Sequence, residues 1–318
     1  MKTLYIGDPH VTPSSLEESE KLFEYVIKVG SEVSVSKIVI LGDLFHTHSI
    51  IRQEVNAFWT KVFHRLSLLN KPIVVLVGNH DQIHIKEFEI SIYSLMAFKD
   101  KIANVNIVND FYIDGKIIYH AYTHSAERLI KNCTEAIGTD TLVAHGNFTE
   151  LIFGDMVEPS LIPQIKIISG HVHKHSLSKG KVFYAGSPTW TSAIDAGDDK
   201  GIWLIDDTTD EKELLSTRNV VIPMYKMVIR EGEEIPEIPA NAKMAFELIG
   251  QSSWIATLKK KLKGKGSIKA TPLDRKHAKA DNTKLLNIDD YANSNFTPLI
   301  GVSILEITNY IRGIDGIQ

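Results

Sequence analysis

The chain has 318 residues, an apolar fraction of 43% and a formal net charge of −4, values that fit a soluble globular protein. It is long for one domain, so two domains are expected, and no apolar run approaches the roughly 20 residues that span a bilayer. The first predicted strand begins almost at Met1, which leaves no room for a cleavable signal peptide and favours a cytoplasmic location. The single cysteine, Cys133, excludes an intrachain disulfide and a cysteine-based metal site.

Strands alternate with helical patterns up to about residue 210. Helices are expected after Ser14 or Ser15, over 51–69 and over 87–98, and Asp114-Gly115 marks a hairpin turn. Apolar runs typical of buried strands cover residues 3–6, 37–41, 72–77, 141–144, 165–168, 181–185 and 201–205. This alternation predicts a layered α/β domain with helices packed on the faces of sheets.

The composition of the sequence changes after residue 215. An acidic, proline-rich stretch at 231–240 separates two strand-like segments, 225–229 and 244–248. We therefore predict two domains, residues 1–215 and residues 216–318, of which the second is the smaller.

Seven aspartate, asparagine and histidine residues stand at the C-terminal ends of predicted strands. They lie in the motifs D-P-H, G-D-L-F-H, G-N-H-D, A-H-G and H-V-H, as Asp8, His10, Asp43, Asn79, His145, His171 and His173. In an open α/β sheet the ligand crevice lies at the carboxyl ends of the strands, so clusters distant in sequence converge there. One such motif alone says little, but five in order, each after a strand, predict two metal sites.

The residue types in these motifs suit particular metals. In D-P-H and H-V-H the two ligands are two positions apart, so in an extended segment both point to one side. Aspartate can bridge two cations, while imidazole and an asparagine carbonyl fill terminal positions, and such a shell without thiolate suits manganese, iron or zinc better than calcium. Two cations can activate water and stabilise both oxygens of an in-line displacement at phosphorus. The sequence therefore predicts a binuclear phosphoesterase centre.

His80 is the expected general acid. It stands between Asn79 and Asp81, so its ring can face a phosphate while Asp81 holds the other ring nitrogen. Proton donation to a departing oxygen contributes roughly a hundred- to ten-thousand-fold in rate. His46 is a second candidate for contact with the scissile phosphate or the leaving group.

The remaining histidines do not fit the strand-end pattern. His48 is among those expected to have surface or packing roles, while His124 and His175 are minor candidates because they lie near the motifs in sequence.

The motifs G-D-P-H, G-D-L-F-H, G-N-H-D, A-H-G, S-G-H-V-H and Y-A-G-S-P resemble those of the calcineurin-like metallophosphoesterases. They are most similar to the SbcD-type DNA repair and recombination nucleases, which include recombination endonuclease subunits of large phages and the meiotic-recombination nuclease of eukaryotes. The resemblance covers roughly residues 1–210. It implies a layered metallophosphoesterase sandwich of mixed α/β sheets flanked by helices, with a smaller C-terminal α+β capping domain.

The resemblance also implies a role for each motif residue. One metal is implied at Asp8, His10 and His173, the other at Asn79, His145 and His171, with Asp43 as the bridge. His80 matches the catalytic histidine of the family, and His46 matches its substrate-side histidine. Further implications are dependence on Mn²⁺, exonuclease action on duplex DNA ends, endonuclease action on single strands and hairpins, dimerisation, and partnership with an SbcC-type ATPase.

Two features depart from relatives. Phosphatases of the superfamily carry an arginine soon after the second motif, where this chain reads G-D-L-F-H-T-H, which argues against a phosphatase. Larger nuclease relatives continue with a segment that binds the ATPase coiled coil, whereas this sequence ends at Gln318. Docking is therefore expected through 296–317 or another surface.

A wide apolar stripe on the predicted helix 51–69 could form a dimer interface together with the helix 87–98. The stripe comprises Val55, Phe58, Trp59, Val62, Phe63 and Leu66. A two-fold homodimer would place two active sites on one duplex. The alternative is that both helices simply cover the sheet.

A basic segment spans residues 259–279, where eight lysines and one arginine accompany a single aspartate. Phosphate neutralisation by such groups gives sequence-independent affinity for DNA. The candidate DNA contacts are Lys259, Lys260, Lys261, Lys263 and Lys265. The alternative is a solvated face.

Two other functions stay open at this stage. One is hydrolysis of a small nucleotide phosphodiester at the same metal site, and the other is a non-catalytic scaffold with a phosphoesterase fold. A complete set of ligands together with His80 favours an enzyme, and the basic segment favours DNA as its substrate.

Overall fold

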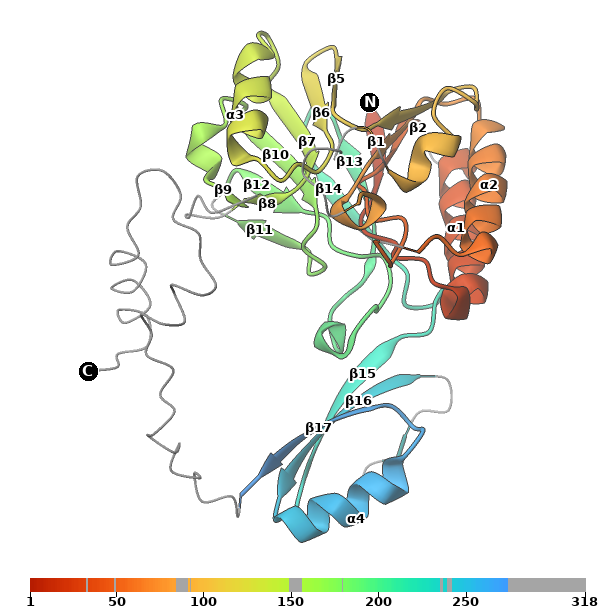
Figure 1. The fold of residues 1–318 in the computed structure, drawn as a ribbon, viewed down its shortest axis with the longest axis vertical. Coiled ribbons are helices and arrows are strands. Elements are labelled where there is room, and N and C mark those ends of the chain that lie inside the picture. The colour runs from red at the N-terminus through yellow and green to blue at the C-terminus, as the bar shows by residue number, and fades with distance from the viewer. Residues whose placement is uncertain are drawn as a thin grey trace, which may run out of the picture. The chain divides into compact units, whose positions relative to one another are not determined.

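The computed structural model describes residues 1–32, 34–48, 50–83, 91, 93–148, 156–178, 180–234, 237–238 and 242–273 (Figure 1). They fall into two compact units. The first comprises Met1–Met227, Pro236–Phe246 and Gly264–Ser267, and the second holds the described residues of 228–235, 247–263 and 268 onward. The domain boundary after residue 215 stays a prediction.

The first unit contains a six-stranded sheet in the order β14-β13-β1-β2-β3-β4. The strands β1 to β4 run parallel, and β13 and β14 add antiparallel at one edge. Their bounds are β1 (Lys2–Ile6), β2 (Val35–Ile40), β3 (Ile73–Leu76), β4 (Val105–Val108), β13 (Gly201–Asp206) and β14 (Lys212–Ser216).

A second six-stranded sheet follows in the order β11-β12-β10-β7-β6-β5. Its four inner strands are parallel and both edge strands are antiparallel. The bounds are β5 (Phe111–Asp114), β6 (Ile117–His120), β7 (Thr141–His145), β10 (Lys166–Gly170), β11 (Ser176–Ser178) and β12 (Val182–Tyr184). The turn at Asp114-Gly115 joins β5 and β6 as predicted, and β8 (Asn147–Phe148) pairs with β9 (Met156–Val157).

The two sheets pack face to face between helices. In β2, Ile38 and Ile40 face the core under α1 (Leu16–Glu32) and α2 (Gln53–Ser67), while Val39 faces the other sheet. The second sheet is covered on its outer face by α3 (Ala126–Glu135), where Leu129 belongs to the third apolar core. The layers are therefore helices, sheet, sheet and helix, which confirms the predicted sandwich of mixed sheets.

The start of α1 differs from the expectation. Instead of Ser14 or Ser15, Thr12 is the capping residue, and its side chain accepts the backbone N–H of Ser15 at the end of a short 3-10 turn, Pro13–Ser15. This turn leads directly into α1, whose first turn carries Glu17 and Glu18 near the positive end of the helix dipole.

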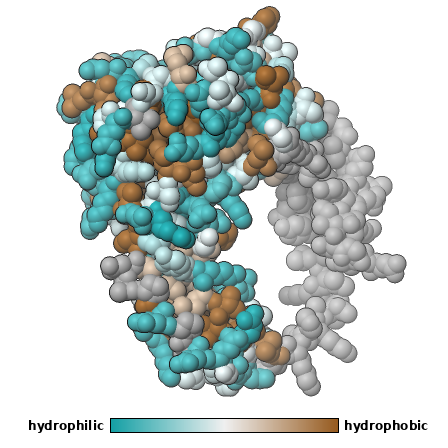
Figure 2. All heavy atoms as spheres, turned by 180° about the vertical axis from the view of Figure 1, so that it is seen from behind, coloured by the Kyte–Doolittle hydropathy of each residue, from teal (hydrophilic) through white to brown (hydrophobic). Residues whose placement is uncertain are grey.

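The apolar stripe of α2 is buried inside the unit. Its members Val55, Phe58, Trp59, Val62, Phe63 and Leu66 are all at most 6% exposed and belong to the core between α1, α2 and the first sheet. The proposal that this stripe forms a dimer interface is therefore wrong, because the sheet and α1 already cover it. Dimerisation itself stays a prediction. On the face drawn in Figure 2, hydrophobic side chains lie interspersed with hydrophilic ones.

The predicted helix 87–98 lies largely outside the described residues. Its described part contains a 3-10 helix, Ser94–Ala97, in which Leu95 is buried.

The C-terminal segments form a three-stranded sheet, β15-β16-β17, with one helix. The strands are β15 (Met224–Arg230), β16 (Lys243–Gly250) and β17 (Ser267–Pro272). The helix α4 (Ser252–Leu262) buries Ile255, Leu258 and Leu262 as its apolar spacing predicts, and its last turn carries Lys259, Lys260 and Lys261. Residues 274–318, which include the end of the basic segment and the predicted docking stretch 296–317, lie outside the described residues.

Within the part of the chain that the structure describes, no helix combines the length and apolar character needed to cross a membrane.

Candidate metal centre

All seven predicted ligands follow the carboxyl ends of parallel strands. The first sheet supplies Asp8 and His10 after β1, Asp43 after β2 and Asn79 after β3, and the second supplies His145 from β7 and His171 and His173 after β10. Contacts across the sheets bring the two sets together, because Asp8 Oδ1 accepts the backbone N–H of His171 at 2.8 Å and lies 3.3 Å from His145 Nδ1. The site is thus built where the ends of the two sheets meet.

One group of donor atoms gathers around Asn79. Its Oδ1 lies 2.9 Å from His145 Nε2 and 3.0 Å from His171 Nδ1, and His145 Nε2 is also 3.4 Å from Asp43 Oδ1. His145 is oriented from behind, since its Nδ1–H donates to the carbonyl of Leu41 at 2.7 Å and directs Nε2 toward the group. The cluster Asp43, His145 and His171 could hold one metal ion.

A second group gathers around His10. Its Nε2 lies 2.9 Å from His173 Nε2 and 3.4 Å from Asp43 Oδ2. The two oxygens of Asp43 therefore face different groups, Oδ1 toward His145 and Oδ2 toward His10. This is the arrangement that a bridging carboxylate requires.

The backbone at three of these residues is strained. His10, Asp43 and His171 have positive φ angles of 45°, 52° and 78°, a region that side chains other than glycine rarely adopt. Such conformations cost about 1–3 kcal/mol each and persist where the surrounding structure enforces them. Their concentration at the meeting point of the sheets indicates that this part of the fold is shaped by function.

Divalent cations fit this donor set. Asp8 Oδ2 is buried and has no hydrogen-bond partner among the described residues, so it leaves an acceptor directed into the protein. Burial lowers the pKa of His10 to about 3, which keeps its imidazole neutral, as a metal ligand must be. The donors are carboxylate, amide and imidazole groups without thiolate, a mixture that suits first-row transition metals.

The charges at the centre are coupled through Asp43. Burial alone would raise its pKa, but His145 and His10 hold the pKa of Asp43 well below its usual range. Burial alone would also lower the pKa of His145, yet Asp43 and Asp8 raise it to about 9. In the protein without metal, this raised pKa favours the positively charged imidazolium form of His145, and a bound cation would displace the second ring proton.

His80 lies beside the second group. Its backbone N–H donates to Asp43 Oδ1 at 2.9 Å, and its ring lies 4.6 Å from the ring of His10, centroid to centroid. Because its Nδ1–H donates to the carbonyl of His46 at 2.7 Å, only Nε2 is left to exchange a proton with a substrate. His80 is also close enough to His10 and Asp43 to act as a ligand itself.

The role predicted for Asp81 is wrong. Its carboxylate does not hold the ring of His80 but accepts the backbone N–H groups of Leu44, Phe45 and Gly78 at 3.0–3.3 Å. Burial, with a contribution from Asp43, raises the pKa of Asp81 to about 7. Asp81 therefore ties the loop after β2 to the loop after β3, and it supports the site through the backbone.

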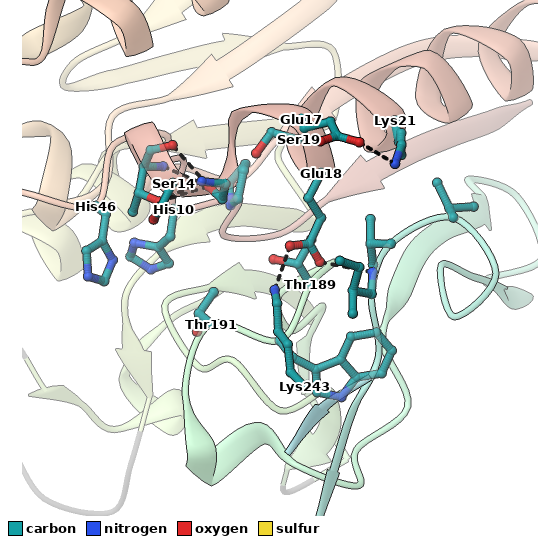
Figure 3. Close-up of a pocket in the computed structure, with 17 residues that line it drawn as sticks. His10, Ser14, Glu17, Glu18, Ser19, Lys21, His46, Thr189, Thr191 and Lys243 are labelled. Atoms are coloured by element: carbon teal, nitrogen blue, oxygen red, sulfur yellow. Dashed lines mark hydrogen bonds and ion pairs between the residues drawn. The ribbon is translucent and has the colours of Figure 1, made fainter. Parts of the chain in front are cut away.

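A polar pocket opens beside the centre (Figure 3). It has a volume of about 410 Å³, and all its lining residues belong to the first compact unit. His10 and His46 lie at one end, and a Glu18–Lys243 ion pair of 2.5 Å crosses it. The side chain of His46 is largely open to solvent, and the pKa of its imidazole is lowered by partial desolvation and by the nearby imidazole of His80.

Two residues near the centre have roles that the sequence pattern does not indicate. His48 stacks on His80 with ring centroids 3.9 Å apart, and its Nδ1–H donates to the carbonyl of Asn79. Tyr122 stacks over His171 at 6.1 Å and is 7% exposed. Two sequence features could have indicated that these residues lie at the centre. His48 stands two positions after His46, and Tyr122 stands just after the strand β6.

The predicted DNA contacts come from other segments of the chain than the predicted ligands. Lys259, Lys260 and Lys261 are exposed on the last turn of α4, and Lys263 and Lys265 are exposed between α4 and β17.

Gly78→Ala should destabilise the protein by about 1–3 kcal/mol, the usual cost of overpacking. A Cβ at this position would lie 2.2 Å from Asp43 Oδ1 and 2.3 Å from the Asp43 backbone nitrogen. Gly146→Ala is the control, since its Cβ would meet nothing closer than 3.7 Å. Thermal unfolding of both variants measures the effect, and equal melting temperatures would contradict the close packing of Asp43 against Gly78.

The contribution of His10 to the free energy of unfolding of the metal-free protein should become less favourable as the pH drops from 7 to 5. The unfolded chain protonates His10 near pH 6.5, whereas the folded protein resists protonation down to about pH 3, so acid favours unfolding. Compared with the wild type, His10→Gln should shift the free energy of unfolding at pH 5, measured relative to that at pH 7, by about 2 kcal/mol in favour of the folded state. Urea unfolding with a chelator present measures this, with exposed His64→Gln as control. An unchanged pH dependence in His10→Gln would refute the assignment.

Comparison with known proteins places the chain in a family. Residues 1–175 match the family described as Calcineurin-like phosphoesterase. The chain is 25% identical over 253 residues to "Putative phosphoesterase 244L" of Invertebrate iridescent virus 6, covering 71% of this chain and 84% of that protein. It is 24% identical over 209 residues to "Putative phosphoesterase 078R" of Invertebrate iridescent virus 3, covering 59% of this chain and 57% of that protein.

A solved archaeal phosphodiesterase is similar in structure with a TM-score of 0.37 and 15% identity, over 68% of this chain and 99% of that chain. The family match covers more than half of the sequence and contains every motif that lines the centre. The chain therefore belongs to the calcineurin-like phosphoesterases, a family of hydrolases that use divalent metal ions.

Proposed function

We propose that this phosphoesterase is a DNA nuclease that depends on two divalent metal ions, most simply Mn²⁺. It would act as an exonuclease on duplex ends and as an endonuclease on single strands and hairpins, in DNA repair or recombination. The observation that carries the proposal is the complete donor set around Asp43, with the imidazole of His80 beside it. The nuclease specificity rests on the motif resemblance to SbcD-type enzymes and on the basic end of α4.

The residues of the chain divide the reaction between them. The metals, when bound by the two donor groups, would supply activated water and neutralise charge on the phosphate. His80 would donate a proton from Nε2 to the leaving oxygen, because the His46 carbonyl occupies Nδ1. His46 lies on the pocket side, where it could contact the leaving group.

Partners follow from the same resemblance. An SbcC-type ATPase would regulate access of DNA, and a homodimer would place two centres on one duplex. Since the stripe of α2 is buried, the dimer would need a different surface.

A second candidate is hydrolysis of a small nucleotide phosphodiester. The observation in its favour is the pocket beside His10 and His46, whose volume of about 410 Å³ falls within the range typical of small-ligand sites. A non-catalytic scaffold is a weaker alternative, because a scaffold has no need of an intact donor set with His80.

Replacing His80 and Asp43 separates acid catalysis from metal binding. His80→Ala should keep both metals and lose at least a hundredfold in cleavage, as loss of a general acid predicts. Asp43→Ala should instead lower metal occupancy, because each of its oxygens faces one donor group. Cleavage rates and calorimetric Mn²⁺ titration measure the two effects. Loss of a metal in His80→Ala would make His80 a ligand, and two undisturbed sites in Asp43→Ala would refute the bridge.

The same assay identifies the substrate class. Purified protein with Mn²⁺ would be offered a linear duplex, a DNA hairpin and a cyclic nucleotide. Turnover of the cyclic nucleotide alone would favour the small phosphodiester, and no turnover of any substrate by a metal-loaded protein would favour the scaffold.

Replacing Lys259, Lys260 and Lys261 with alanine should weaken duplex binding regardless of sequence. The slope of log affinity against log salt should flatten by about 0.9 for each DNA phosphate that the variant no longer neutralises. The matched control replaces Lys28, Lys116 and Lys131, which are also exposed and remove the same charge. A salt slope equal in the two folded triple variants would leave the lysines of α4 as a solvated face.

A further inference from the structure

A buried lysine lies behind the metal centre. Lys200 is 2% exposed and its ammonium group lies 2.9 Å from the carboxylate of Asp195, itself 3% exposed. Burying an ion pair is costly, and its attraction repays the desolvation only with good geometry and further hydrogen bonds. The neighbours of this pair therefore show what the arrangement achieves.

Both members of this ion pair are connected to His173 by hydrogen bonds. Lys200 Nζ donates to the His173 carbonyl at 2.7 Å, and Asp195 Oδ2 accepts the hydroxyl of Thr191 at 3.0 Å. Thr191 Oγ1 in turn lies 3.1 Å from His173 Nδ1. A closed ring of hydrogen bonds thus holds the backbone and the imidazole of one residue.

The donors and acceptors in this ring fix the state of the imidazole. Asp195 has a pKa below its ordinary value, because Lys200 and the surrounding donors outweigh the effect of burial, so its carboxylate only accepts. The single hydroxyl proton of Thr191 is then used toward Asp195, and Thr191 Oγ1 must accept from His173 Nδ1–H. This leaves the lone pair on His173 Nε2, which lies 2.9 Å from His10 Nε2.

We infer that Thr191, Asp195 and Lys200 position His173 for one of the two metals, by fixing its tautomer and its ring orientation. This inference rests on the proposed function, in which His173 is a ligand. Hydrogen-bond partners behind a metal-binding histidine typically change metal affinity ten- to a hundredfold when removed. These three are positioning residues, since they act through His173.

The local chain explains how distant residues reach the ring. Asp195 Oδ2 also accepts the backbone N–H groups of Thr191 and Ser192, so it stabilises the 3-10 turn Ala193–Asp195 from within. The same turn places Thr191 at the pocket wall, on the side opposite Ser14 and Glu17 (Figure 3). The Asp195 carboxylate therefore both stabilises this turn and binds the hydroxyl that contacts His173.

The test removes the hydroxyl of Thr191 and counts metal sites. In calorimetric Mn²⁺ titration, Thr191→Val should weaken one of two sites ten- to a hundredfold and leave the other unchanged. Thr191→Ser, which keeps the hydroxyl, should restore wild-type affinity. Thr189→Val is the matched control, because Thr189 lies on the same loop and outside the ring. A melting temperature for each variant shows that it is folded.

His173→Ala distinguishes failure of this inference from failure of the proposed function. If His173→Ala binds two Mn²⁺ ions as the wild type does, the ligand assignment itself is refuted. If His173→Ala loses one site while folded Thr191→Val keeps both at wild-type affinity, the positioning role alone is overturned. Should Thr191→Val not fold, Thr191→Ala adds no bulk and gives the same readout.

Discussion

The Asp43 carboxylate lies between the two donor groups of the candidate metal centre. Its two oxygens face separate donor groups, one around His145 and one around His10. To reach that position the chain takes a positive φ at Asp43 itself and passes so close to Gly78 that no side chain fits there. The loops after β2 and β3 are then locked together by Asp81, whose carboxylate accepts backbone N–H groups from both.

The candidate metal centre takes its donors from both sheets. The first sheet brings Asp8, His10, Asp43 and Asn79, and the second brings the three remaining histidines to the same point. A fully buried apolar layer between the sheets, with Val39 and Ile168 among its members, fixes their separation. Because close-packed protein interiors are hard to compress, this layer holds the polar centre at the ends of the two sheets in a defined geometry. Burial also strengthens the charge coupling between Asp43 and His145.

Chemistry and specificity reside in different parts of this chain. In the proposed function, the donor set and His80 would serve any phosphodiester, because they act on the phosphate itself. Under that proposal, the choice between DNA and a small nucleotide would depend on surroundings such as the pocket beside His46 and the lysines of α4. The positions of His48 and Thr191 show a further level of control, since each acts on a residue that would touch metal or substrate.

The sequence predicted the strands that carry the motifs and the layered α/β class, because apolar runs and turn residues are local signals, and the motif resemblance added the sandwich. It also predicted that the seven candidate ligands share one crevice, since the carboxyl ends of parallel strands converge. Three further features became evident from the three-dimensional structure: these strands form two sheets, the stripe of α2 is covered, and Asp81 binds backbone N–H groups instead of the ring of His80. The ring through Lys200 likewise joins residues 18 and 27 positions from His173. A local pattern shows which face of an element is apolar, but its partner across the core is chosen by packing and hydrogen bonding between distant segments.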